Sequence, residues 1–118
     1  LSAFCGVVSA AAAAGAGLAW LQDLDDAAIG AVIANTLLTS GGILCDGAKA
    51  SCASKISVSL DNAMLAIEMV KRNRSLPAGQ GLAGRTIDET ISNVAAIARE
   101  GMKETDNQIL EMMIRANG

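Results

Sequence analysis

The chain has 118 residues, which is enough for one domain, with 52% hydrophobic residues and a net charge of −3. It lacks histidine, which excludes His-containing metal sites and Cys-His or Ser-His catalytic pairs. The absence of a basic block and of stacking aromatic residues argues against nucleic-acid binding. Three cysteines, an odd number, are not typical of a secreted disulfide framework, so we expect a reducing, cytoplasmic location.

Residues 3–21 carry no charge and consist mainly of small apolar side chains. The length is close to the roughly 20 residues that span a bilayer. However, Ala and Gly gain little in hydrocarbon, and the segment lacks the basic flanks of a membrane span or the positive start of a signal peptide. We therefore predict a helix that is buried on nearly all sides, with Gly6, Gly15 and Gly17 as points of close approach.

Asp25 or Asp26 is expected to cap a second helix over about residues 26–40, because a carboxylate accepts hydrogen bonds from the free N–H groups at a helix start. A glycine-rich segment follows over residues 41–52. An apolar stripe at helical spacing then predicts a third helix from about residue 51 to about residue 74.

Residues 75–85 hold the only proline and are predicted to form a surface loop. Thr86-Ile87-Asp88-Glu89 fits a capping box at the start of a fourth helix, which Gly101 ends. Thr105-Asp106-Asn107-Gln108 repeats this pattern before a short last helix. Because strand-like alternation is absent, we predict an all-α fold of about five helices around the central Ala/Gly-rich helix, in one domain over residues 1–118.

The glycine-rich loop between the second and third helices carries most of the reactive groups, including Cys45 and Cys52. Together with Cys5, these thiols suit a metal ion or cluster better than disulfides, and a helix start stabilises the thiolate of Cys52. Cysteine is also often a small buried hydrophobic residue, and zinc would need a fourth ligand from Asp46 or from a partner. Lys49 is a candidate contact for a carboxylate and Asp46 for an ammonium group or a proton, although a surface lysine and a loop-capping aspartate explain them equally well.

The run Gly-Ile-Leu-Cys-Asp-Gly-Ala-Lys-Ala-Ser-Cys-Ala-Ser-Lys, residues 42–55, resembles the C-terminal region of the L-cysteine desulfidase / UPF0597 family. That family is related to the iron–sulfur L-serine dehydratase alpha chain. Phe4-Cys5-Gly6-Val7-Val8 is similar to the first cysteine segment of the family. Residues 86–94, 98–102 and 105–106 are similar to its closing helices, so the resemblance covers nearly all of the chain.

The resemblance implies a four-iron–four-sulfur cluster held by Cys5, Cys45 and Cys52. Three cysteine ligands leave one iron open, and that iron serves as a Lewis acid. The implied reaction is a β-elimination from L-cysteine or L-serine without pyridoxal phosphate. It gives pyruvate and ammonia, together with sulfide from cysteine or water from serine.

Members of that family are several times longer than this chain, and their N-terminal part supplies further substrate-binding groups. We therefore expect this chain to be the C-terminal part of a longer enzyme and to be inactive alone, and to lack the cluster after preparation in air. Its expected partners are the amino-acid substrate and an N-terminal domain or second subunit of the same enzyme, with a homo-oligomer as one form of assembly. The alternatives are a non-enzymatic helical zinc-binding domain and a subunit-interaction domain.

Overall fold

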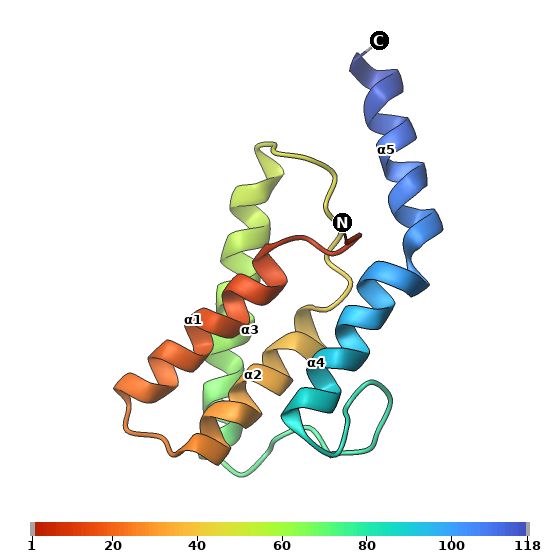
Figure 1. Cartoon of the computed structure of the whole chain (residues 1–118). Helices are drawn as coiled ribbons and strands as arrows, with labels where there is room; N and C mark the ends of the chain where they lie inside the picture. The colour runs from red at the N-terminus through yellow and green to blue at the C-terminus, as the bar shows by residue number, and fades with distance from the viewer. Residues whose placement is uncertain (1, 118) are drawn as a thin grey trace.

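The computed structural model describes residues 2–117, and within that range it is all-helical (Figure 1). The prediction of an all-α fold with five helices is confirmed. The five α-helices are α1 (Val7–Leu21), α2 (Asp26–Ser40), α3 (Ser51–Lys71), α4 (Ile87–Ala96) and α5 (Lys103–Asn117). A π-helical turn, Ile97–Gly101, joins α4 to α5, and Phe4 forms an isolated antiparallel bridge with Leu44.

Helices α1, α2 and α3 pack against one another, and α4 packs on α2 (Figure 1). The core is built from small and branched aliphatic side chains, as the scarcity of aromatic residues requires. One cluster lies among α1, α2 and α4 and contains Val8, Ala12, Leu37 and Val94. A second cluster lies among α1, α2 and α3 and contains Ala19, Val32, Ala66 and Ile67.

Gly15 lies at the closest approach of the three packed helices. A Cβ atom at this position would lie 3.1 Å from Val32 Cγ1 and 3.3 Å from Ala63 Cβ. A Cβ at Gly6 or Gly17 would meet nothing within 4 Å. Close approach of helices is therefore confirmed at Gly15 alone of the three predicted positions.

Helix α1 buries one face and exposes the other, in contrast to the prediction that it is buried on nearly all sides. Ala11, Ala12 and Ala19 are buried, whereas Ala14 and Trp20 are exposed. The difference arises because only α2 and α3 pack on this helix with extensive contacts. None of the helices described is both long and apolar enough to cross a membrane.

The starts of α2 and α4 follow local capping chemistry. Asp25 Oδ1 accepts a hydrogen bond of 2.8 Å from the N–H of Ala28, and Thr86 Oγ1 accepts one of 3.1 Å from the N–H of Glu89. The carboxylate of Glu89 returns to the N–H of Arg85 at 2.7 Å instead of to that of Thr86. The predicted caps of α2 and α4 are confirmed, although the reciprocal half of the capping box is shifted by one residue.

Two predicted boundaries are wrong. Helix α3 ends at Lys71 instead of Arg74, because Asn73 adopts the left-handed conformation with φ 54° that commonly follows a helix end. Helix α5 begins at Lys103 instead of after Thr105. There the N–H of Asp106 already donates to the carbonyl of Met102 at 2.9 Å, so the backbone turn forms without the Thr105 side chain as its cap.

Candidate cysteine site

The segments that carry Cys5 and Cys45 lie side by side. The N–H of Cys5 donates to the carbonyl of Ile43 at 2.7 Å, and the N–H of Cys45 donates to the carbonyl of Ala3 at 2.9 Å. These two bonds flank the bridge between Phe4 and Leu44. Neighbouring residues of paired extended segments point to opposite faces, so this register puts both cysteines on one face as diagonal neighbours. Such neighbours typically lie about 7–8 Å apart, and their Cβ atoms somewhat closer.

Cys52 lies in the first turn of α3, as predicted, and the preceding loop wraps around its sulfur. The N–H of Lys49 lies 3.4 Å from Cys52 Sγ, and the thiol donates to the carbonyl of Gly47 at 3.6 Å. Gly47 has φ 93°, a conformation that favours glycine. A Cβ at Gly47 would also lie 2.7 Å from Cε of Met113 in α5, but this methyl group ends a flexible side chain and can shift, so the backbone conformation is the main reason for glycine here.

All three cysteines are free thiols; Cys45 is exposed, and Cys5 and Cys52 are partly buried. Within residues 2–117, however, no three His, Cys, Asp or Glu side chains gather closely enough to hold a metal ion. A cluster distributes its thiolate ligands over several irons, so its ligands lie farther apart than those of a single ion. The three free thiols come from two adjoining loop segments and a helix start. Thiols are the donors that an iron–sulfur cluster uses, but these three do not form a site for a single metal ion.

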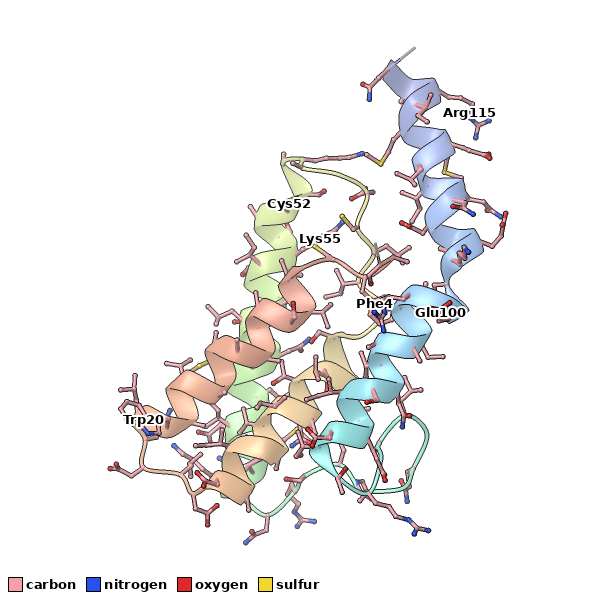
Figure 2. All side chains as sticks on the ribbon, viewed as in Figure 1. Phe4, Trp20, Cys52, Lys55, Glu100 and Arg115 are labelled. Carbon is pink, nitrogen blue, oxygen red and sulfur yellow. The ribbon has the colours of Figure 1, made fainter. Side chains whose placement is uncertain are left out.

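Lys55 is a candidate site residue that the sequence analysis missed, and Figure 2 shows it close to Cys52 at the same end of α3. Its Nζ donates to the carbonyl of Leu44 at 2.8 Å and to Oδ1 of Asp46 at 2.7 Å. Asp46 is therefore already ion-paired. Lys49, with a side chain 48% exposed, lies 3.7 Å from the other oxygen of Asp46 and contributes a looser ion pair.

The electrostatics of this pair favour its ionised form. The hydrogen bond from Lys55 lowers the pKa of Asp46, against an opposing effect of partial burial. The same hydrogen bond raises the pKa of Lys55, and the charges of Cys5 and Cys52 add to this effect more weakly. Both partners are thus charged at neutral pH, and the ammonium group lies within electrostatic reach of two of the three thiols.

A cleft of about 600 Å³ opens between the cysteine loop and α5. One wall of the cleft contains the polar side chains of Asp46, Lys49 and Lys55, together with the apolar side chain of Leu44. The opposite wall is formed by apolar side chains of α5, namely Ile109, Met112, Met113 and Ala116. The volume falls in the range of small-molecule sites, and a few polar groups on an otherwise apolar lining are typical of them.

These features define an all-helical chain in which a glycine-rich loop brings the segment of Cys45 beside those of Cys5 and Cys52, and in which Asp46 of that loop forms ion pairs with Lys55 and Lys49. Residues 1–111 match the family described as the serine dehydratase alpha chain, and the chain belongs to this family. No solved structure was found to match the chain.

The curated relatives are proteins of the UPF0597 group. The chain is 46% identical to a UPF0597 protein of Finegoldia magna and 45% identical to one of Lachnoclostridium phytofermentans, over 97% of this chain in each case. It is 36% identical to the UPF0597 protein YhaM of Escherichia coli over 96% of this chain. The match covers only 26–27% of these relatives, so the chain spans about a quarter of their length.

Proposed function

We propose that this chain is the cluster-binding part of a lyase that removes the β-substituent of L-cysteine or L-serine, giving pyruvate, ammonia and sulfide or water. The observation that supports the proposal most is the pairing of the Cys5 and Cys45 segments beside the helix start that carries Cys52. Membership of the serine dehydratase alpha chain family supports the same reaction class. The cytoplasm, where thiols stay reduced, is the compartment that suits such a site.

In this proposal, Cys5, Cys45 and Cys52 hold a four-iron–four-sulfur cluster. When bound, the iron that has no cysteine ligand supplies a Lewis acid for the carboxylate and leaving group of the substrate. Lys49, half exposed at the cleft, is proposed to contact the substrate carboxylate. Asp46 lines the same cleft and is proposed to orient the substrate ammonium group while it remains bonded to Lys55.

The test is anaerobic reconstitution of the full-length enzyme with iron and sulfide, followed by measurement of iron content, visible absorbance and pyruvate release. We expect broad thiolate-to-iron absorbance and pyruvate from L-cysteine or L-serine. Replacing Cys5, Cys45 or Cys52 singly by Ser should remove most of the bound iron and the activity, because each loss leaves two thiolate ligands. Stoichiometric zinc without iron would contradict the proposal and support the non-enzymatic zinc-binding alternative.

We further propose that the exposed side of α1 and α3 packs against the remainder of the longer enzyme. An apolar groove of about 190 Å³ runs between these helices and is lined by Val7, Ala10, Ala11, Ala14, Ile56, Ser59 and Leu60. Ile56 is 56% exposed in this chain, and the neighbouring Leu60 and Met64 are exposed as well. Apolar surface of this kind is typical of an interface, and about three quarters of the length of the relatives lies outside the match and can cover it.

A further inference from the structure

The three cysteines lie on three backbone segments: the start of the chain, the glycine-rich loop and the first turn of α3. Lys55 joins the last two. It lies three residues after Cys52 on the same helix, and its two acceptors, the Leu44 carbonyl and the Asp46 carboxylate, flank Cys45 on both sides. One ammonium group therefore fixes the backbone around Cys45 relative to the helix that carries Cys52.

The same contact reaches the first segment through the loop. Ile43, next to Leu44, accepts the hydrogen bond from the N–H of Cys5, and Cys45 donates to the carbonyl of Ala3. A shift of the loop at Leu44 would therefore move the segment that carries Cys5 as well. The Lys55 side chain is only 22% exposed, so water competes less with its bonds than with those of Lys49.

A positive charge at this position also has an electrostatic role. Three thiolates brought together repel one another, and a nearby ammonium group offsets that repulsion. Lys55 lies on the same helix as Cys52, and its hydrogen bonds to Leu44 and Asp46 place its ammonium group beside the segment of Cys45. Lys49 has no hydrogen bond from its ammonium group to the loop backbone among the described contacts, and it is therefore the natural control.

We propose that Lys55 is a positioning residue that holds the three cysteine thiols at a set separation before a cluster is inserted. The proposal rests on the proposed function only in one respect, namely that the group bound by the thiols is an iron–sulfur cluster. Its structural content, one lysine that fixes the distances between thiols, is testable in protein without any cluster.

The experiment measures thiol separation in the cluster-free protein with dibromobimane, a short thiol–thiol crosslinker, and maps the crosslinked pairs by peptide mass spectrometry. The variants are Lys55→Met, which keeps the length of the side chain and removes its charge, Lys55→Arg, which keeps the charge, and the control Lys49→Met. We expect Lys55→Met to lower the yield of crosslinks between Cys45 and Cys52 by roughly tenfold or more, the size expected from losing a charge-assisted hydrogen bond. Lys55→Arg should recover most of the yield, and Lys49→Met should match the unmodified chain.

Circular dichroism and thermal unfolding of each variant show whether it folds. If Lys55→Met does not fold, Asp46→Asn weakens the same contact from its other end and should give the same loss of crosslinks. Unchanged crosslink yields in whichever of these two variants folds would overturn the inference, and so would an equal loss in Lys49→Met.

Iron content after anaerobic reconstitution of the full-length enzyme separates this inference from the proposed function. If the unmodified enzyme binds no iron while the crosslinks depend on Lys55, the function fails and the positioning role stands. If the unmodified enzyme binds iron and Lys55→Met neither lowers the iron content nor changes the crosslinks, the function stands and the positioning role fails.

Discussion

At the scale of single residues, Gly15 sets how closely α1 can approach its two neighbours. A methyl group at this position would press on Val32 and Ala63, whereas one at Gly17 would meet open space. Gly17→Ala should therefore stabilise this chain by about 0.5–1 kcal/mol through helix propensity. Gly15→Ala should gain less, and Gly15→Val should cost about 1–3 kcal/mol because it overpacks the crossing.

Urea denaturation of the 118-residue chain measures these differences. Gly17→Ala is the matched control, since it makes the same exchange on the same helix without a nearby neighbour. If Gly15→Val were as stable as the unmodified chain, α1 would have to lie farther from α2 and α3 than the structure shows.

The residues that the sequence could predict are those whose partners are close in the chain. Asp25 and Thr86 cap their helices by bonding an N–H three residues ahead, so the pattern alone locates them. Lys55 escaped prediction because its acceptors, at Leu44 and Asp46, become neighbours only once the loop folds back on α3. Its spacing of three residues from Cys52, which places both on one side of a helix, was the available signal.

At the scale of elements, α5 differs from the other helices. Figure 1 shows it extending away from the packed helices, it contains no buried residue, and its main helix contact is with the π-helical turn before it. Met113 nevertheless touches the cysteine loop at Gly47. Most helix stability in proteins comes from tertiary packing, and one such contact supplies little of it, so α5 depends mainly on its intrinsic helical propensity.

We therefore expect the amide protons of α5 to exchange with solvent much faster than those of α2, which packs on three other helices. Hydrogen exchange followed by mass spectrometry on the cluster-free chain measures this difference peptide by peptide. Peptides from α4 provide the internal comparison, since α4 packs on α2 and leads directly into the turn before α5. Equal protection of α2 and α5 would mean that α5 packs more firmly than its exposed side chains indicate.

At the scale of the whole molecule, the uncharged sequence of α1 is typical of a fully buried helix, but one face of α1 is exposed in this chain. The helix has neither an acidic first turn nor a basic last turn, yet Ala14 and Trp20 lie at the surface, and Trp20 is 69% exposed. A polar face would be the usual solution for a surface helix. The longer enzyme proposed above would account for this sequence pattern, because the rest of that enzyme would cover the groove between α1 and α3.

This explanation predicts that one substitution affects stability differently in the isolated chain and in the full-length protein. Ala14→Lys places a charge in the groove, where the isolated chain leaves the side chain in water. The thermal stability of the 118-residue chain should then hardly change. In the full-length protein the same lysine would be buried without a partner, at a cost on the order of several kcal/mol, and a fall in melting temperature should reveal it.

Ser57→Lys is the matched control, because Ser57 is an exposed residue of α3 outside the groove lining, one helical turn before Asp61. A lysine there should leave both the isolated chain and the full-length protein near their original stability, since an exposed ion pair contributes little. Equal tolerance of Ala14→Lys and Ser57→Lys in the full-length protein would show that the groove stays open to water. The uncharged face of α1 would then need a reason other than burial against the rest of the enzyme.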